Sequence, residues 1–326
     1  DCQGNCDGDA YIDPCGYCDT DLLNDCSVGC VDIMAEFSIG EEELQCENGI
    51  TEEGYDCNDL TTILNIMHSN PNSLHGGMDA DNNKIITVYE YGVQQWSTGR
   101  LTSLDLNYYE NVVIPTSCNY RLTTLPENIG ELSALRKLSL KNNELTSIPE
   151  SITNLISLEQ LLLESNKITS LPDEFGNLVN LEVLIINFNQ IGHLPVTIGN
   201  LVSLEQLWAH HNHLENLPES IGRMSQLEWL YLNNNSLQSL PESIGNLGSL
   251  KKLTVDNNLL INLPESLCNI YEGLDIFSVS ENYICSGSYP ICLTEVVTSG
   301  SQICVDCPPH YFLIEGYCAY EFDYNI

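Results

Sequence analysis

Basic residues are scarce in this sequence, which has 10 lysines and arginines against 46 aspartates and glutamates and a formal net charge of −36. All of the basic residues lie between Lys84 and Lys252. Binding to nucleic-acid phosphates requires cationic side chains, so this composition argues against nucleic acid as a partner. Closely spaced carboxylates repel one another, and either bound calcium or adaptation to a salty medium would relieve that repulsion.

Long apolar runs and catalytic motifs are missing as well. No stretch approaches the roughly 18 to 20 apolar residues of a membrane span, and no basic-then-apolar leader opens the chain. We therefore interpret the chain as a mature form without a membrane span. It contains no His-Glu-x-x-His segment, no nucleophile elbow, no phosphate loop and no pair of acids in a recognisable catalytic setting. We expect a protein that is not an enzyme.

Cysteines are absent from the regular central part of the chain. Of the 15 cysteines, eight lie in the first 57 residues, six lie in the last 59, and the other is Cys118. Cysteines clustered at the two ends predict disulfide-stapled caps and an extracellular, secreted protein. The alternative is zinc, because Cys15-x-x-Cys18 and Cys304-x-x-Cys307 have the local spacing, but neither has a matching second pair. The odd number leaves at least one thiol free or paired between chains.

The central part contains a repeat. A Leu-Pro or Ile-Pro pair recurs every 23 residues, beginning at Leu125, Ile148, Leu171, Leu194, Leu217, Leu240 and Leu263. Each unit follows the pattern L-P-x-x-I-G-x-L-x-x-L-x-x-L-x-L-x-x-N-x-L. A single unit is too small to bury its own leucines, so the units must stack into a solenoid.

The L-x-L step of each unit predicts a short strand. Its leucines point inward and the residues between them face a groove, so the strands form a parallel sheet on the concave side. After each strand an asparagine recurs, at which a buried amide satisfies loop backbone groups that lack a sheet partner. These asparagines are Asn143, Asn166, Asn189, Asn212, Asn235 and Asn258. One extra residue near Gly273 moves the last unit, whose asparagine is Asn282.

The repeats resemble the 23-residue class of leucine-rich repeats found in intracellular Ras-associated scaffolds and their plant relatives. The resemblance covers a little over half of the chain and implies an α/β-type solenoid with a parallel concave sheet. The cysteine-rich flanks depart from those scaffolds, so their cytoplasmic setting is not carried over. We expect a Cys/Asp-rich disulfide module at 1–57, an EF-hand-like helix-loop-helix at 58–98, the solenoid at 99–284, and a Cys-rich cap and tail at 285–326.

A segment between the first module and the repeats has the spacing of a calcium-binding loop. Loop positions 1, 3, 5, 7 and 12 are occupied by Asp79, Asp81, Asn83, Ile85 (through its carbonyl) and Glu90. This pattern of oxygen ligands resembles an EF-hand loop and implies bound calcium. Two departures are Lys84 at the usual glycine position and a proline at Pro71 that shortens the entering helix. An Asx-rich turn is the alternative.

Helices are expected on both sides of that loop. The apolar residues Leu60, Ile63, Leu64 and Met67 fall on one helical face, and Asn58 or Asp59 is placed to cap the start. A second helix is expected over residues 87–96, where it would position the ligand at loop position 12.

The first 30 residues are rich in Asp, Gly and Cys and too poor in leucine to form a core alone. They resemble the calcium repeats of secreted proteins in the thrombospondin type 3 style. The resemblance implies oxygen donors at Asn5, Asp7, Asp9 and Asp13. A plain disulfide knot is the alternative.

Apolar and aromatic residues occupy groove-facing positions in the middle of the repeats. They are Leu162, Val183, Ile185, Phe188, Trp208, His210, Trp229 and Tyr231. A contiguous apolar patch on a surface predicts a partner; the alternative is that the rings stabilise one another across strands. His210, His211 and His213 suggest a metal site, but alternation sends the first two in different directions, which argues against a shared ion.

Two further features concern the surface of the protein. Asn234-Asn235-Ser236 is an N-glycosylation sequon, which predicts either an exposed, glycosylated Asn234 or an unused site. At the end of the chain, aromatic and apolar residues alternate with polar ones at Tyr320, Phe322, Tyr324 and Ile326. This alternation predicts a strand, which either covers the last repeat of its own chain or is donated to a neighbouring subunit.

These features together predict an extracellular, non-enzymatic structural or interaction protein. We expect a calcium-stabilised subunit of a filament, sheath or hair that contacts other proteins, including copies of itself. The alternative is a secreted or cell-surface recognition module, such as an adhesin or receptor ectodomain, that binds a glycan or a protein in the aromatic groove.

Overall fold

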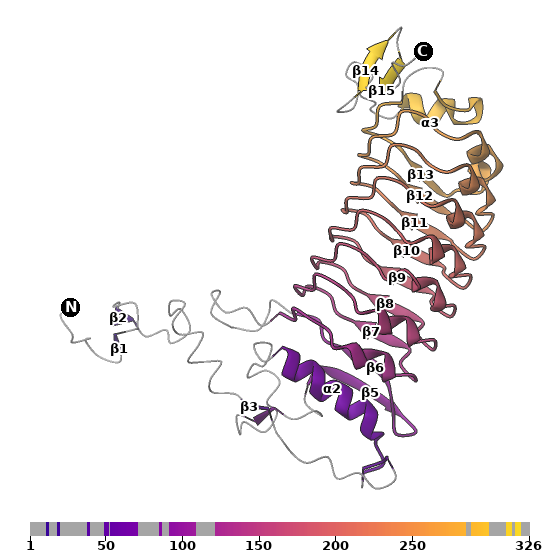
Figure 1. Ribbon diagram of the computed structural model, residues 1–326. Helices are drawn as coiled ribbons and strands as arrows, with labels where there is room; N and C mark the ends of the chain where they lie inside the picture. Colours follow the sequence, from indigo (N-terminus) through magenta and orange to yellow (C-terminus); the bar gives the residue numbers. More distant parts are fainter. Residues whose placement is uncertain are drawn as a thin grey trace.

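The computed structural model describes residues 49–51, 53–70, 91–108, 121–284 and 288–299, together with the backbone of short strands elsewhere in the chain. Those short strands are β1 (Tyr11–Ile12), β2 (Cys18–Asp19), β3 (Ser38–Ile39), β4 (Ile85–Ile86), β14 (Tyr311–Ile314) and β15 (Tyr317–Tyr320). The central range contains the repeats and forms a curved solenoid (Figure 1).

The described residues form a nine-stranded sheet whose strands follow one another in sequence order (Figure 1). The strands are β5 (Val93–Ser97), β6 (Arg100–Asp105), β7 (Lys137–Ser139), β8 (Gln160–Leu162), β9 (Val183–Ile185), β10 (Gln206–Trp208), β11 (Trp229–Tyr231), β12 (Lys252–Thr254) and β13 (Ile276–Ser278). Strands β6 to β13 are parallel, whereas β5 pairs antiparallel with β6. The predicted parallel sheet is confirmed, including the extra residue before β13, because Leu253 pairs with Phe277 rather than with residue 276.

Short 3-10 helices line the opposite side of the solenoid. They are η2 (Glu127–Glu131), η3 (Glu150–Asn154), η4 (Phe175–Asn177), η5 (Val196–Asn200), η6 (Glu219–Arg223), η7 (Glu242–Asn246), η8 (Glu265–Asn269), η9 (Tyr271–Gly273) and η10 (Ile291–Leu293). Most begin directly after the repeat proline, which lacks an N–H and has a φ suited to a helix start. The repeat glycine permits close stacking, because a Cβ on Gly199 would lie 2.1 Å from the carbonyl oxygen of Ser220.

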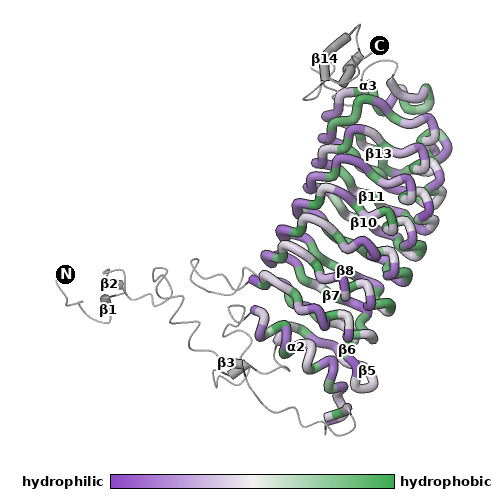
Figure 2. Tube along the Cα trace, viewed as in Figure 1, coloured by the Kyte–Doolittle hydropathy of each residue, from purple (hydrophilic) through white to green (hydrophobic). Residues whose placement is uncertain are grey.

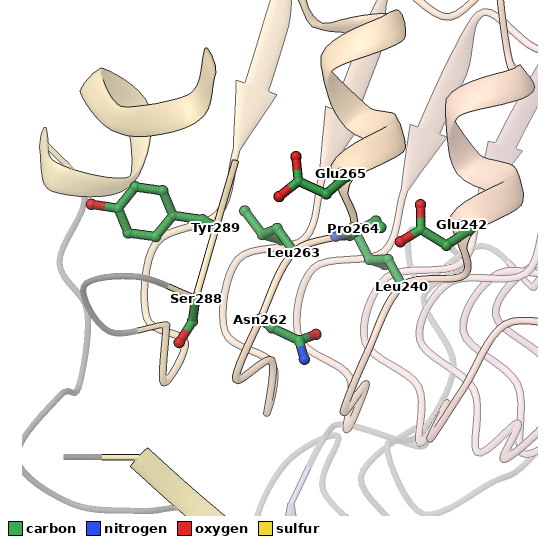
Figure 3. A pocket seen from close by; sticks show the side chains of 8 residues that line it. All are labelled: Leu240, Glu242, Asn262, Leu263, Pro264, Glu265, Ser288 and Tyr289. Carbon is green, nitrogen blue, oxygen red and sulfur yellow. The ribbon is translucent and has the colours of Figure 1, made fainter. Parts of the chain in front are cut away.

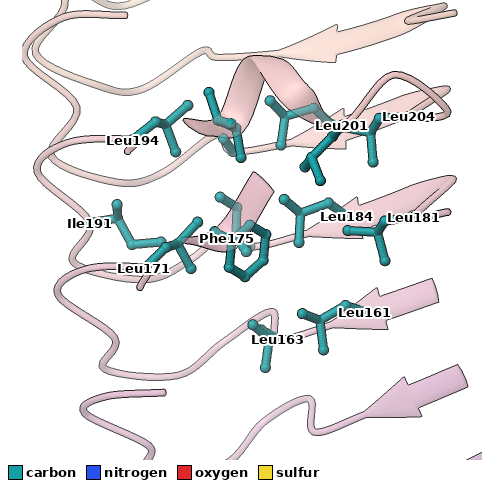
Figure 4. Packing of buried hydrophobic residues seen from close by; sticks show 14 of the residues in the cluster. Leu161, Leu163, Leu171, Phe175, Leu181, Leu184, Ile191, Leu194, Leu201 and Leu204 are labelled. Carbon is teal, nitrogen blue, oxygen red and sulfur yellow. The ribbon is translucent and has the colours of Figure 1, made fainter. Parts of the chain in front are cut away.

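The leucines of the repeat form one continuous core between the sheet and these helices. Figure 4 shows them filling the space inside the coils, and Figure 2 shows the hydrophobic positions recurring along the array. Phe175 is fully buried where the neighbouring repeats carry Ile152 and Ile198. The core also includes Leu60 of the first described helix and Val297 near the other end. Stacking therefore buries what one repeat would expose.

The predicted asparagine ladder is confirmed. At Asn189 the side-chain oxygen accepts from the backbone N–H of Ile168 at 3.0 Å. Its amide donates to the carbonyls of Leu163 at 3.0 Å and Ile186 at 3.1 Å. Equivalent bonds recur at the other ladder positions through Asn282. The ladder thus satisfies buried backbone groups between adjacent repeats.

A helix closes the first end of the solenoid. Helix α2 (Cys57–Ser69) buries Leu60, Ile63 and Ile66 in the common core. Asn70, directly after the helix, acts as a further ladder residue, because its amide donates to the carbonyls of Ile66 and Thr124, each at 2.9 Å. The array therefore continues its asparagine bonding into the cap.

The predicted cap residue of α2 is wrong. The helix begins at Cys57, and Asp56 caps it by accepting from the backbone N–H groups of Asn58 and Asp59. Asp59 does not cap the helix because its carboxylate is buried and bonded to Arg100. Sequence spacing does not reveal that pair, whose members are 41 residues apart.

The predicted second helix over 87–96 is also wrong in its described part. Val93–Ser97 is strand β5, which pairs with β6 and extends the solenoid sheet. Gly92 precedes it with φ +74°, and a Cβ there would lie 2.6 Å from the carbonyl oxygen of Asp105. Pairing with β6 gives the strand backbone hydrogen-bond partners that a helix would have found internally.

A disulfide joins the last repeat to the segment that follows it. Cys268 in η8 is bonded to Cys292 in η10, next to helix α3 (Thr294–Ser299). Leu293 and Val297 extend the common core at this end. The bond agrees with a stapled C-terminal cap. Cys57 is disulfide-bonded as well, and the pairing of the other cysteines stays a prediction.

None of the helices in the described parts of the chain is both long and apolar enough to cross a membrane.

Candidate binding surface on the concave sheet

The structure brings the predicted groove residues together on four adjacent repeats. We call these eight residues the concave patch: Leu162, Val183, Ile185, Phe188, Trp208, His210, Trp229 and Tyr231. In the sheet register, Trp208 lies between Ile185 and Tyr231. Residues Val183, Gln206 and Trp229 form a second row beside them. Alternation along each strand therefore places the patch on one face, as the sequence predicted, except for Phe188, which follows β9 in a turn and lies outside this alternation.

Members of the concave patch differ in exposure. Phe188 is 48% exposed, while Trp208, Trp229 and Tyr231 are half-buried. Leu162 is only 8% exposed, so it offers little surface to a partner, and its role in binding stays a prediction. It lies beside Ile185 at the sheet floor. The accessible part of the patch is centred on β9, β10 and β11.

Aromatic rings of the patch also contact one another. The ring centroids of Trp208 and Tyr231 lie 4.9 Å apart at 62°. The Phe188 ring is stacked on His211 at 4.3 Å, and the amine of Lys252 lies 4.2 Å from the centre of a Trp229 ring. These contacts support the cross-strand alternative, because neighbouring rings stabilise one another. Part of the ring surface nevertheless stays open to solvent, most of all at Phe188.

Phe188 lies in an unusual backbone conformation. Its φ is +54°, in the left-handed region that bulky side chains avoid. The same turn position is at positive φ in the other repeats as well, where it carries Asn142, Ser165, His211, Asn234, Asn257 or Glu281. Asparagine tolerates this conformation, whereas phenylalanine there costs roughly 1–3 kcal/mol. Strain of this kind concentrates at functional sites, and here it presents a phenylalanine ring to solvent.

His210 lies against the rings of the patch. Burial lowers the pKa of His210 below its ordinary value of 6.5, and the neighbouring His211 lowers the pKa further, while Glu164 opposes the change. The imidazole is therefore neutral at neutral pH.

We expect His210 to make the folded protein less stable in acid. Its pKa is lower in the folded than in the unfolded state, so protons bind the unfolded state more strongly. The free energy of unfolding should fall as the pH drops through about 6.5. His210→Gln should remove that part of the fall in urea titrations at several pH values, and His193→Gln at an exposed position should not. An identical pH dependence in wild type and His210→Gln would contradict the lowered pKa.

Sequence reasoning missed an apolar stripe beside the patch. Ile156, Val179 and Val202 are 58%, 44% and 50% exposed and occupy the same position in three consecutive repeats. Reading one repeat position down the whole array would have found them, because they are 23 residues apart. The stripe is a second exposed apolar surface on the segments that lead into the strands.

A column of glutamates runs between the stripe and the sheet. Glu159 pairs with Arg136 at 2.6 Å and Glu228 pairs with Lys251. Glu182 and Glu205 lie between them and have no ion pair within the described ranges. This part of the surface is thus negatively charged and favours a partner with basic residues.

The other predicted sites lie largely outside the described residues. That holds for Asn5, Asp7, Asp9, Asp13, Asp79, Asp81, Asn83, Glu90, Phe322, Tyr324 and Ile326. The backbone of Ile85 begins β4, which pairs with β3, and Tyr320 ends β15 opposite Tyr311. Among the side chains that the structure describes, no group of three or more His, Cys, Asp or Glu is placed to hold a metal ion.

Asn234 is less exposed than the sequence suggests. Its side chain is half-buried, and its side-chain oxygen accepts a hydrogen bond from the amide of Asn257 at 2.6 Å. Its backbone φ is +57°. Glycosylation at this residue stays a prediction.

A cavity of about 430 Å³ lies near the C-terminal end of the repeats. Figure 3 shows the residues that line it, with the carboxylates of Glu242 and Glu265 on neighbouring repeats. Glu242 already accepts a hydrogen bond from the backbone N–H of Ser266 at 3.2 Å. The cavity is separate from the concave patch and contains no aromatic cluster.

Two models of leucine-rich repeats match the chain. One describes a leucine-rich repeat region and matches residues 111–215, and the other describes a leucine rich repeat and matches residues 210–260. A comparison with curated proteins found no match.

Solved structures with similar folds were also found. A leucine-rich repeat protein of Leptospira interrogans is 31% identical, with a TM-score of 0.53, over 63% of this chain and 56% of that one. A plant ice-binding protein is 21% identical, with a TM-score of 0.54, over 71% of this chain and 81% of that one. The PEPR1–AtPEP1 complex is 25% identical over 70% of this chain and 35% of that one, with a TM-score of 0.47. The chain thus spans little more than half of the Leptospira protein, and the plant protein bears on the fold alone.

Proposed function

Because the chain is a leucine-rich repeat solenoid with a partly exposed aromatic surface on its concave sheet, we propose that it is a protein-recognition module. The concave patch is its binding surface, and the partner is a protein segment that buries the rings of Trp208, Trp229 and Phe188. The strained, exposed Phe188 ring is the observation that carries this proposal.

The energetics support an anchor that needs flanking contacts. Aromatic side chains bury about 150–250 Å² each. Because these rings are already mostly buried, completing the burial of Trp208, Trp229 and Tyr231 would contribute at most roughly 7 kcal/mol at about 25 cal/mol per Å². Association costs of similar size offset much of this. Contacts to the neighbouring stripe would supply the remainder.

Removing two rings should abolish binding without unfolding the protein. We expect the double variant Trp208→Ala, Trp229→Ala to lose at least tenfold in affinity, since about 1.4 kcal/mol corresponds to tenfold. The probe is a phage-displayed random peptide library selected on wild-type protein, with the isolated peptides then titrated against each variant. Lys137→Ala, on the same face of β7, is the matched control.

Circular dichroism and thermal melting separate the two interpretations of the rings. A double variant that melts like wild type and fails to bind supports the recognition surface. If the double variant unfolds, the rings are structural. If it binds equally well, the peptides use another surface.

We also propose an extracellular location. The Cys268–Cys292 disulfide supports this proposal, since such bonds persist in oxidising compartments. The net charge of −36 opposes close contact between copies of this chain. For the concave patch it therefore favours a partner of different sequence over assembly with itself in a filament, sheath or hair. If peptide selection fails and oligosaccharides bind, the partner is a glycan.

We propose in addition that calcium stabilises the acidic segment before the repeats. The strand β4 supports this proposal, because Ile85 and Ile86 occupy loop positions 7 and 8 and pair with β3. Val93–Ser97 is a strand rather than the second helix of an EF-hand, which argues against a complete EF-hand. The ligand at position 12 would therefore be held without a helix after it.

Chelation should loosen the first part of the chain more than the repeats. The first 83 residues carry 19 carboxylates, which would repel one another without bound cations. In excess EGTA, limited proteolysis should cut before residue 97 sooner, and Glu90→Gln should reproduce part of this effect. An unchanged digestion pattern would contradict the proposal that calcium stabilises this segment.

A further inference from the structure

A row of hydrogen bonds crosses the concave face beside the strands. At three places in the sheet, the residue that follows a strand by two positions accepts from a hydroxyl on the next strand. Asn107 accepts from Ser139 at 2.8 Å, and Asn233 accepts from Thr254 at 3.0 Å. Asp256 accepts in the same way from Ser278. The row therefore pairs a side-chain acceptor on one repeat with a hydroxyl on the following repeat.

The row is broken in the middle of the concave patch. Asn187 occupies the acceptor position of its repeat, but Trp208 occupies the position of the hydroxyl. His210 faces Tyr231 in the same way one repeat later. As a result the side-chain oxygen of Asn187, the indole Nε1 of Trp208 and the Nδ1 of His210 are buried without a hydrogen-bond partner among the described residues.

These unpaired atoms are costly to leave without partners. Asn187 is only 5% exposed. A buried polar atom without a partner costs roughly 1–3 kcal/mol, and few such atoms occur in folded proteins. The described residues contain six such atoms, of which three are serine hydroxyls on other repeats (Ser151, Ser243 and Ser266). The other three lie together on two neighbouring repeats and indicate a place where a bound group supplies the missing hydrogen bonds.

The charge of the site determines which group fits. Lys141 and Glu164, which occupy the position of Asn187 in the two preceding repeats, form an ion pair with each other at 2.9 Å. His210 is held neutral by its surroundings. The site therefore offers an acceptor at Asn187 and a donor at Trp208 without a free charge. This suits a neutral group with one donor and one acceptor, and it does not suit a carboxylate, a phosphate or an ammonium ion.

We propose that the concave patch contains an amide-binding subsite. The Asn187 oxygen accepts from the N–H of an amide, and the Trp208 indole N–H donates to the carbonyl of that amide. The amide belongs to a protein segment, either as an asparagine or glutamine side chain or as main chain, and a neighbouring aliphatic side chain packs on Ile185 and Phe188. This subsite rests on the proposed function, because it defines the chemistry recognised at the same surface.

A protein amide fits better than a sugar. Sugars stack on open aromatic faces, but here His211 lies on the Phe188 ring and Lys252 lies over Trp229. The side chains around the unpaired atoms are mainly aliphatic and aromatic, including Ile185 on the neighbouring strand. An apolar residue followed by an amide satisfies both features.

The indole N–H resonance of Trp208 tests the subsite directly. The chain has three tryptophans, and Trp208→Phe assigns the resonance by removing it. The probes are N-acetyl-leucinamide, methyl glucoside and sodium acetate, each titrated into the full chain labelled with nitrogen-15. We expect N-acetyl-leucinamide to move the Trp208 resonance downfield in a saturable way. Asn187→Leu should weaken this binding by about tenfold.

Asn233→Leu is the matched control, because it makes the same change at an acceptor position outside the unpaired group. A saturable shift with N-acetyl-leucinamide that Asn187→Leu weakens and Asn233→Leu does not supports the subsite. No saturable shift, an equal effect of both substitutions, or a shift caused only by methyl glucoside or acetate overturns it. If Asn187→Leu does not fold, the wild-type probe titrations still decide between these outcomes.

The phage-selected peptides distinguish failure of the subsite from failure of the proposed function. Trp208→Phe keeps a ring and removes only the N–H donor. If Trp208→Ala abolishes peptide binding and Trp208→Phe leaves it unchanged, the patch binds proteins and the amide subsite is wrong. If both substitutions reduce binding, as we expect, the donor contributes in addition to the ring.

Discussion

Replacing Arg100 with alanine should lower the free energy of unfolding by about 3–5 kcal/mol, as breaking a buried ion pair does. The reason is its partner Asp59, whose side chain is fully buried. Arg100 donates from Nε and Nη2 to the two carboxylate oxygens of Asp59, each at 2.9 Å. Without the guanidinium, a carboxylate would stay buried with one remaining bond, from the backbone N–H of Leu101 at 2.8 Å.

The position of this pair makes the effect large. It joins α2 to β6 and so holds the cap on the first repeat. The hydrogen bond to Asp59 raises the pKa of Arg100, so the arginine stays charged at every accessible pH. Titration therefore cannot remove the charge of Arg100 and break its pair with Asp59.

Arg136→Ala provides the matched control. Arg136 also pairs with an acid, Glu159 at 2.6 Å, but its side chain is exposed. Exposed pairs contribute at most about 1 kcal/mol. Urea unfolding followed by circular dichroism should show a large loss for Arg100→Ala and a small one for Arg136→Ala. Equal losses would mean that burial of the Asp59 carboxylate does not control the stability of this cap.

Asn189→Ala should lower the free energy of unfolding by roughly 3 kcal/mol or more, because it leaves several buried backbone groups without a hydrogen-bond partner. The side chain satisfies the N–H of Ile168 and the carbonyls of Leu163 and Ile186. Those groups lie on two consecutive coils of the solenoid, so the substitution affects the contact between repeats as well as one loop. No other side chain in the described part of this ladder reaches the same N–H.

Asn180→Ala is the control for this prediction. Asn180 is exposed and makes a single side-chain bond, to the carbonyl of Ile156 at 2.8 Å. Its loss should change the free energy of unfolding by about 0.5 kcal/mol or less, as for most surface substitutions. Comparable urea midpoints for the two variants would show that water replaces the ladder bonds without cost.

Most of the solenoid was predictable from local spacing. A period of 23 residues aligns equivalent positions on neighbouring coils, so the strands, their parallel order and the asparagine ladder follow from the pattern. The same reasoning located the rings of Trp208, Trp229 and Tyr231 on the concave face, because side chains alternate along a strand. It also anticipated the extra residue before β13.

Features that join distant parts of the chain were not predictable in this way. The sequence suggested that Asp59 caps α2, but Arg100 occupies its carboxylate from 41 residues away. The segment before Arg100 was expected to be a helix and is instead β5, because β6 lies beside it and supplies hydrogen-bond partners. Local periodicity carries no information about which strand or charge will lie alongside.

The unpaired atoms of the concave patch belong to the same category. Asn187 resembles the ordinary polar residues at its position in other repeats, and its sequence context gives no sign of a missing partner. The partner is missing because the next repeat supplies Trp208 where Ser139, Thr254 and Ser278 supply hydroxyls elsewhere. The repeat period sets which side chains face the groove. The stacking of coils sets which of their polar atoms are left without a hydrogen bond, because hydrogen bonding depends on the pair of residues that meet across two strands.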